Sequence, residues 1–254
     1  MALKPENLVR IVVNFCFAGC LQWNFKPSNS YLRVWEHLLT EFMMRNFYRA
    51  FLTACMVAVL GVVGAMSQAD DKDGWVTIFD GKNLDGWKVN ENPNSIKLEN
   101  GLIVTHGERS HLFYVGDKKP FKNFEFLAEV MTKPNSNSGI FIHTEFQDTG
   151  WPAKGYECQV NNTYAPDPQK TGGLYNTVKV LKAPAEDDKW FNYYVKVEGK
   201  HVIVKIDDKV VVDYTEPADK AGPVKLSEGT FALQAHDPKS TVMYRSVKVK
   251  RLAD

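Results

Sequence analysis

The stretch FNYYVKVEGKHVIVKIDDKVVVDYT, residues 191–215, is the clearest indicator of the fold. Three runs rich in Val, Ile and Tyr are separated by EGK (198–200) and DDK (207–209), which are typical of tight hairpin turns. Successive strand side chains point to opposite faces, so one face of the middle run is apolar throughout: Val202, Val204, Ile206. The stretch therefore predicts two consecutive hairpins and a three-stranded antiparallel meander.

Short runs of the same kind recur on both sides of this meander. They are rich in β-branched and aromatic residues and are separated by Gly, Asn, Asp and Pro. No helical period is present among them. The runs are WVTIF, IKLENGLIVT, LFYV, FEFLAEVMT, GIFIHTEF, YECQV, TFALQA and TVMYRSVKVKRL. This regular spacing predicts an all-β sandwich or barrel.

The first 69 residues have a different character. Residues 43–69 combine two arginines, an apolar run from Ala50 to Met66 and a small-residue ending, which is the layout of a signal peptide cleaved after Ala69. A membrane anchor and lipidation at Cys55 are the alternatives. Because signal peptides begin a chain, we interpret residues 1–42 as an upstream extension and residues 70–254 as one exported domain.

Charge and cysteine content limit the function classes of that domain. Residues 70–254 carry 25 Lys and Arg and 27 Asp and Glu, so nothing in the balance attracts nucleic acid or an anionic membrane. We expect neither partner, and no stable membrane insertion after cleavage. Cys158 is the single cysteine after residue 69, so the core must hold this domain without an internal disulfide.

Alternation along three separate strands predicts three polar rows. Each row contains an imidazole or a carboxylate, and none contains Lys or Arg. The rows are Phe141, His143 and Glu145; Glu157, Gln159 and Asn161; and Ala232, Gln234 and His236. Two interpretations remain open: a cleft that grips a polar ligand, and the ordinary wet face of a sheet. Cys158 points away from its row, toward the core.

Two longer connections flank the strand YECQV. Residues 147–155 and 161–173 contain Trp151 and Tyr164 among Pro and Gly. Exposed aromatic side chains on loops suit the apolar faces of sugar rings, whereas buried ones would close the ends of the sandwich. The sequence leaves both interpretations open. It contains no Gly-x-Ser-x-Gly elbow, phosphate-binding Gly-rich loop, His-Glu-x-x-His pair or glucanase carboxylate pair.

Several ordered motifs resemble those of a known family. The chain resembles the bacterial 3-keto-disaccharide hydrolase family in a series of ordered motifs: TIFDGKNLDGWKV, SNSGIFIHTEF, GYECQVNN, TGGLYN, the 189–214 segment, and GTFALQAHD followed by VMYRSVKVKRL. The resemblance spans about residues 74–252. It implies a concanavalin A-like jelly-roll sandwich of two antiparallel sheets, export to the periplasm or the medium, and a small oxidised glycoside as substrate.

The resemblance also implies a mechanism. A ketone at C3 acidifies the C2 proton of a glucose unit, so a base can remove it, the C1 substituent can leave, and water can add back. By position, Glu157 and Gln159 match the family's Gly-Tyr-Glu-x-Gln strand, and His236 with Asp237 matches its closing segment. We expect Glu157 to act as general base or as ligand of a divalent cation, and His236 as partner acid or second ligand. Gln159 and Gln234 are implied as hydroxyl binders, with Asp237 beside His236, while Asn137 and Ser138 shape the pocket.

One position departs from the family pattern. His143 stands where many members have Arg, so a fixed cation is replaced by a group that can be neutral at pH 7. A divalent metal held by His143, Glu157 and His236 is one source for the missing charge, and a different substrate or lost activity are the alternatives. A lectin-like binding domain without chemistry is the second functional hypothesis.

Overall fold

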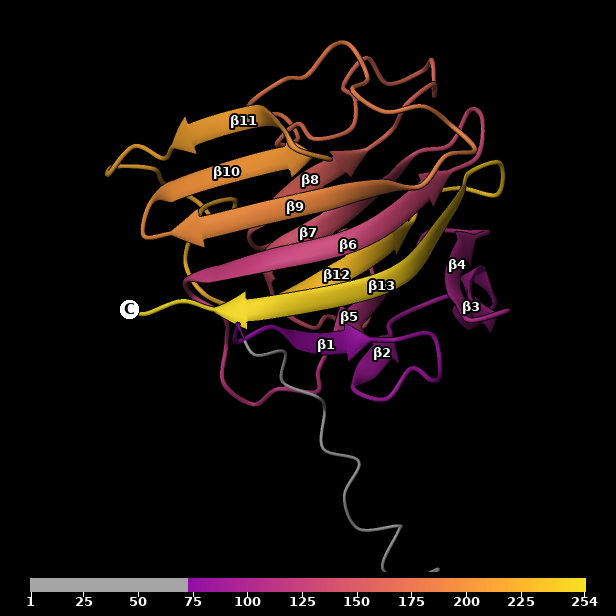
Figure 1. Ribbon diagram of the computed structural model, residues 1–254, viewed down its shortest axis with the longest axis horizontal. Helices are drawn as coiled ribbons and strands as arrows, with labels where there is room; N and C mark the ends of the chain where they lie inside the picture. The colour runs from indigo at the N-terminus through magenta and orange to yellow at the C-terminus, as the bar shows by residue number, and fades with distance from the viewer. Residues whose placement is uncertain (1–72) are drawn as a thin grey trace, which may run out of the picture. The chain divides into compact units, whose positions relative to one another are not determined.

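The computed structural model describes residues 73–254, which form two antiparallel sheets packed face to face (Figure 1). The larger sheet has the order β11 (Lys209–Thr215), β10 (His201–Ile206), β9 (Phe191–Glu198), β6 (Phe124–Thr132), β13 (Thr241–Arg251), β4 (Leu102–His106), β3 (Ile96–Glu99), and β1 (Val76–Phe79) also pairs with β13. The smaller sheet has the order β2 (Trp87–Val89), β5 (Ser110–Tyr114), β12 (Thr230–Ala235), β7 (Ser138–Thr144), β8 (Tyr156–Val160). The predicted all-β sandwich is confirmed.

Helix is almost absent from this part of the chain. A single 3-10 turn, Pro93–Ser95, precedes β3. Within residues 73–254, no helix is long and apolar enough to cross a membrane. The predicted extension (1–42) and signal peptide (43–69) lie outside the described residues, so they stay predictions.

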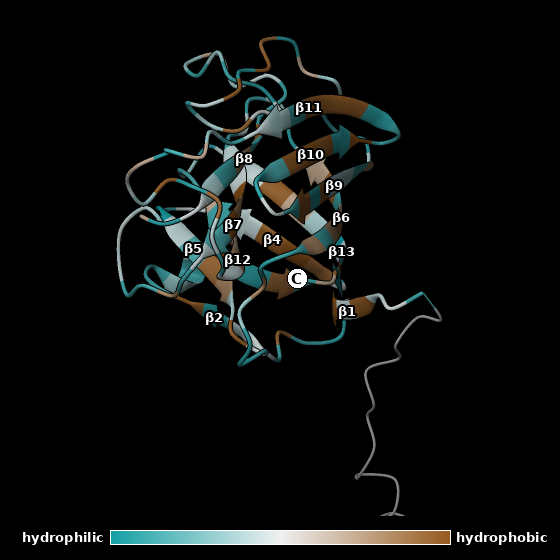
Figure 2. Ribbon diagram, turned by 90° about the vertical axis from the view of Figure 1, so that its left-hand side faces the viewer, coloured by the Kyte–Doolittle hydropathy of each residue, from teal (hydrophilic) through white to brown (hydrophobic). Residues whose placement is uncertain are grey.

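The core lies between the inner faces of the two sheets (Figure 2). Strand β6 alternates strictly, with Phe124 and Phe126 buried on its inner side. Both rings lie 5.0 Å, between centroids, from the ring of Phe231 on β12, so aromatic contacts join the sheets. Cys158 is fully buried in this core, as its place in the alternation predicts.

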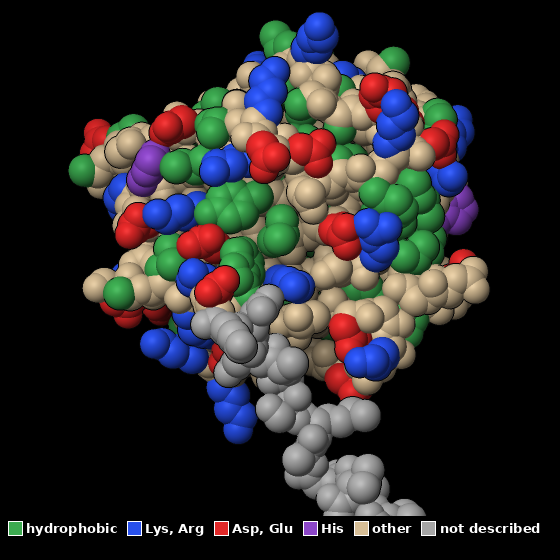
Figure 3. Space-filling model, viewed as in Figure 1, with side chains coloured by type: hydrophobic (Ala, Val, Ile, Leu, Met, Phe, Trp, Pro, Cys, Tyr) green, Lys and Arg blue, Asp and Glu red, His purple; other side chains and the backbone are tan. Residues whose placement is uncertain are grey.

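The meander of residues 191–215 forms as predicted. β9, β10 and β11 pair in sequence, and Val202, Val204 and Ile206 are buried. The outer face of this sheet is mixed in charge, with basic and acidic side chains interspersed (Figure 3). Arg245 bonds to Glu129 there, and Lys196 pairs with Glu198 at 2.9 Å. This is an ordinary solvated sheet face.

Strand β7 breaks the predicted alternation at His143. The pairing with β12 shifts between Thr144 and Ile142, and His143 is the extra residue of this β-bulge, with φ 54°. Two glycines on neighbouring segments make room for it, because a Cβ at Gly155 or Gly229 would collide with the β7 backbone. The prediction that His143 shares a face with Phe141 is therefore wrong.

The His143 imidazole instead joins two loops on the core side. Its Nε2–H donates to the carbonyl of Lys122 at 2.9 Å, and its Nδ1 accepts the backbone N–H of Ser227 at 3.1 Å. The ring packs edge-on against Phe124, with centroids 5.4 Å apart. Burial lowers the pKa of His143 to about 4, so the ring is neutral at pH 7.

We predict that His143→Leu lowers the free energy of unfolding by about 2–3 kcal/mol, because two hydrogen bonds of about 1 kcal/mol each are lost and Leu is strained at positive φ. Asn adopts a positive φ more readily than Leu, so His143→Asn should lower the free energy of unfolding by less. Urea unfolding measures both values.

The same two variants test the pH dependence. The pKa of His143 is lower in the folded protein than in the unfolded chain. The contribution of His143 to the free energy of unfolding is therefore full above about pH 6.5 and is lost as the pH falls toward 4. Wild type should therefore lose more unfolding free energy between pH 7 and 4.5 than His143→Asn. Equal losses would contradict this assignment.

Candidate functional site

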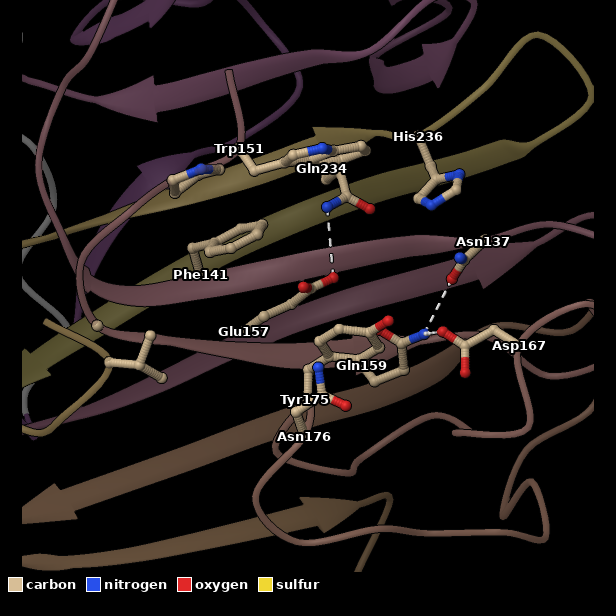
Figure 4. A pocket seen from close by; sticks show the side chains of 13 residues that line it. Asn137, Phe141, Trp151, Glu157, Gln159, Asp167, Tyr175, Asn176, Gln234 and His236 are labelled. Atoms are coloured by element: carbon tan, nitrogen blue, oxygen red, sulfur yellow. Dashed lines mark hydrogen bonds between the residues drawn. The ribbon is translucent and has the colours of Figure 1, made fainter. Parts of the chain in front are cut away.

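The outer face of the smaller sheet carries the polar residues that alternation places together. Glu157 of β8 pairs across the sheet with Phe141 of β7, and Gln234 of β12 pairs with His111 of β5. Phe141, Glu157 and Gln234 line a cavity of about 450 Å³ on this face (Figure 4). It is lined by Asn137, Phe141, Trp151, Pro152, Gly155, Glu157, Gln159, Asp167, Tyr175, Asn176, Val224, Gln234 and His236.

Glu157 crosses the sheet because Gly139 has no side chain. A Cβ at Gly139 would lie 2.7 Å from Cγ of Glu157 and would also collide with its carboxyl group. The carboxyl thus passes over β7 and accepts a hydrogen bond from Nε2 of Gln234 on β12, at 3.3 Å. Burial raises the pKa of Glu157 to about 8, the Gln234 bond opposes this rise, and the charge of Asp167 adds to it.

His236 follows β12 and is oriented by its neighbour. Its Nδ1 lies 2.8 Å from Oδ2 of Asp237, which also accepts the hydroxyl proton of Ser240 at 2.8 Å. Burial would raise the pKa of Asp237, but the hydrogen bonds from His236, Ser240 and Lys239 outweigh it and lower that pKa. An ionised Asp237 keeps the Nδ1 proton on His236 and leaves Nε2 as the nitrogen that exchanges a proton with a ligand.

Two buried amides present free acceptors at this face. Nε2 of Gln159 donates to Oδ1 of Asn137 at 3.0 Å, and Nε2 of Gln234 donates to Glu157. Their carbonyl oxygens, Oε1 of each, are buried without a hydrogen-bond partner among the described residues. Buried acceptors of this kind match ligand hydroxyl groups.

The segment 161–178 adds a second wall to the cavity. It runs along the free edge of β8, where Gln159 N–H donates to the carbonyl of Gly173 and Tyr175 N–H donates to that of Glu157, both at 2.9 Å. The amide of Asn161 organises this segment by donating to the carbonyls of Asp167 and Gln169. In this way Asp167, Tyr175 and Asn176 reach the cavity.

Those three residues were missed by sequence reasoning. Tyr175 and Asn176 belong to the quoted motif TGGLYN, which was the available signal, but alternation cannot place a side chain outside a strand. Asp167 lies among Pro and Gln in a loop, without any local signal.

The segment 147–155, here called the Trp151 loop, forms the opposite wall. Trp151 is 46% exposed and lies above Gln234 in Figure 4. Its ring centroid is 5.4 Å from that of His236, and the Tyr164 ring lies 5.9 Å from His236 on another side. Both predicted aromatic residues therefore lie beside His236 rather than in the sandwich core.

The predicted site residues divide into three groups. Six line the cavity: Glu157, His236, Gln159, Gln234, Asn137 and Trp151. Asp237 and Tyr164 contact His236 but do not line the cavity. Ser138 and His143 lie elsewhere; the Ser138 hydroxyl, on the core side, donates to the backbone carbonyl of Gln234 at 2.6 Å. Within residues 73–254, no three His, Cys, Asp or Glu side chains lie close enough to hold a metal, so the expected metal triad does not form.

The fold is a two-sheet antiparallel β-sandwich, which this chain shares with solved structures described as candidate glycosyl hydrolases. More particularly, the chain belongs to the 3-keto-alpha-glucoside-1,2-lyase-like domain family, whose model matches residues 74–250. The predicted family membership is confirmed.

The relatives differ in how much of the chain they match. A 3-keto-disaccharide hydrolase of Bacteroides thetaiotaomicron is 36% identical over 80 residues, which is 28% of each chain. A structure from Parabacteroides distasonis described as a candidate glycosyl hydrolase has a TM-score of 0.62 and 21% identity, covering 74% of this chain and 99% of that one. A second from the same species has a TM-score of 0.55 and 20% identity, covering 70% and 99%.

We predict that Gly139→Ala moves the Glu157 carboxyl away from Gln234 and toward solvent. The pKa of Glu157 should then fall from about 8 by at least one unit, because its burial is the main cause of the raised value. Carbon-13 NMR of the labelled carboxyl measures this pKa. Urea unfolding is the control, and a pKa that stays near 8 would contradict the proposed packing.

Proposed function

We propose that this protein cleaves the glycosidic bond of 3-keto-glycosides by elimination across C1 and C2, followed by addition of water. The observation that carries the proposal is the cavity shared by Glu157, whose pKa is about 8, and by His236, which Asp237 orients. A pair of proton-transfer groups of this kind suits an elimination better than simple sugar binding. Family membership supports the same class of sugar chemistry.

Each group has a role in this reaction. The ionised Glu157 takes the C2 proton, which the C3 ketone acidifies, and its raised pKa makes it a stronger base than an ordinary carboxylate. The electron pair left on C2 forms the C1–C2 double bond as the C1–O bond breaks. The leaving oxygen takes a proton from Nε2 of His236, whose Nδ1 is held by the carboxylate of Asp237. Water then adds across the double bond.

The remaining polar groups hold the sugar. Oε1 of Gln159 and Oε1 of Gln234 accept hydrogen bonds from sugar hydroxyls, and Trp151 offers a half-exposed ring to an apolar sugar face. Export remains part of the proposal: the layout of residues 43–69 supports a protein of the periplasm or the extracellular medium, where such glycosides are encountered.

We predict that Glu157→Gln lowers kcat/KM by at least about 10³-fold, because Gln cannot accept the C2 proton. The assay is release of nitrophenol from a 4-nitrophenyl 3-keto-glucoside. Glu145→Gln, at an exposed carboxyl after β7, is the matched control and should keep the wild-type rate.

The pH profile tests the same role. Because the base must be ionised, and because nitrophenolate leaves without a proton from His236, wild-type kcat/KM for the 4-nitrophenyl substrate should rise with pH through about 8. For a methyl 3-keto-glucoside, whose leaving oxygen needs a proton, His236→Ala should lower turnover by about 10²-fold or more. Tight binding of the glycoside without release, in wild type and with divalent metal added, would instead favour the lectin-like alternative.

We also predict selectivity against anionic sugars. Among the cavity-lining residues of the described chain, the formal charges are the carboxyl groups of Glu157 and Asp167, and there is no Lys or Arg. A 3-keto-glucuronide should therefore show at least tenfold lower kcat/KM than the matching 3-keto-glucoside. Asp167→Asn should bring the kcat/KM values of the two substrates closer together. Equal kcat/KM values for both substrates in the wild type would contradict the prediction.

A further inference from the structure

A second histidine, His111, lies beside the cavity with no hydrogen-bond partner for either ring nitrogen. It is fully buried on β5, directly across from Gln234 of β12. Neither Nδ1 nor Nε2 has a hydrogen-bond partner among residues 73–254. Burial lowers the pKa of His111 to about 3, so the ring is neutral and retains one donor and one acceptor. A buried polar ring without partners is costly unless another state of the protein uses it.

The Trp151 loop is what covers His111. The Trp151 ring meets the His111 ring edge to face, with centroids 5.6 Å apart, and it also contacts His236. On the other side, the guanidinium of Arg109 lies 5.3 Å from the Trp151 centroid. The Trp151 indole therefore packs against His111 and also lines the cavity, which His111 itself does not line.

The Trp151 loop is held together by bonds within it and is tied to the rest of the chain at Gly150. Gln147 holds it together internally, because its side-chain amide bonds to the carbonyl of Trp151 and the N–H of Ala153. Gly150 N–H donates to Glu91, which also pairs with Arg109. Gly150 has positive φ, a conformation that glycine adopts without cost. Displacing the Trp151 loop therefore costs the hydrogen bond between Gly150 and Glu91, whereas the bonds made by Gln147 lie within the loop and need not break.

We propose that His111 is a ligand-binding residue of a second sugar subsite, which opens when Trp151 is displaced and which holds the leaving-group ring of a disaccharide. This inference rests on the proposed function. The neutral imidazole offers one N–H donor and one nitrogen acceptor, which matches a pair of neighbouring sugar hydroxyls. Next to it, the unpartnered Oε1 of Gln234 joins the subsite to the cavity. Phe113 and Phe141 form the apolar floor beside His111.

The test compares affinities for a methyl 3-keto-glucoside and a 3-keto-disaccharide, measured by calorimetry in the Glu157→Gln background so that neither ligand is consumed. His111→Phe should weaken disaccharide binding at least tenfold and change methyl glycoside binding less than twofold. Trp151→Ala should improve the preference for the disaccharide at least threefold, because the indole no longer has to be displaced. The double variant, His111→Phe with Trp151→Ala, should not show this increased preference for the disaccharide.

Other outcomes would overturn the proposal. If Trp151→Ala weakens disaccharide binding more than methyl glycoside binding, Trp151 stacks on the leaving-group ring without being displaced, and the proposed subsite does not exist. Nitrogen-15 NMR of labelled histidine in the single Glu157→Gln variant gives an independent measurement: the His111 ring signals should shift with the disaccharide and not with the methyl glycoside. Unshifted signals would overturn the proposal even if His111→Phe does not fold. Absence of turnover in the parent protein would reject the proposed function and leave these binding results interpretable.

Discussion

The candidate site depends on one missing side chain, at Gly139. Since nothing projects from β7 there, the Glu157 carboxyl can lie across the strand and meet Gln234 on the next one. This position removes the carboxyl from water without giving it a cationic partner, which raises its pKa. The same contact joins β8 to β12 through side chains, although β7 separates the two strands in the sheet. The chemistry of the site is thus a product of sheet packing rather than of a loop.

Much of the architecture could be predicted from the two-residue alternation of side chains along strands. It identified the meander of β9 to β11, and it placed Glu157, Gln159 and Gln234 on one face, because β8 and β12 remain regular through those positions. It failed at His143, where a bulge turns one residue to the other side, and a bulge depends on the register with β12. It also failed for Asp167, which reaches the cavity from a loop that the side-chain amide of Asn161 holds in place. Alternation along strands does not apply to a loop residue of this kind.

The two outer faces of the sandwich show how the environment gives two glutamate side chains different pKa values. On the larger sheet, Glu129 has Arg245 as its partner, and that hydrogen bond is the main reason that its pKa is lowered. On the smaller sheet, Glu157 has an amide partner and a raised pKa. Lys and Arg interspersed with acids keep the first face soluble and inert. No Lys or Arg among the cavity-lining residues of the described chain offsets the burial of Glu157, so the pKa of this carboxyl stays raised, at about 8.

The segment 161–178 has a consequence for how such a site can diversify. Strand β8 ends the smaller sheet, and an uncovered edge strand invites pairing with other chains. Gly172, Gly173 and Tyr175 cover that edge with backbone hydrogen bonds, while the same segment supplies Asp167 and Asn176 to the cavity. Specificity and protection against aggregation are therefore encoded in one stretch of chain. Evolution can exchange single side chains in it easily, but replacing the whole segment requires a new one that still covers β8.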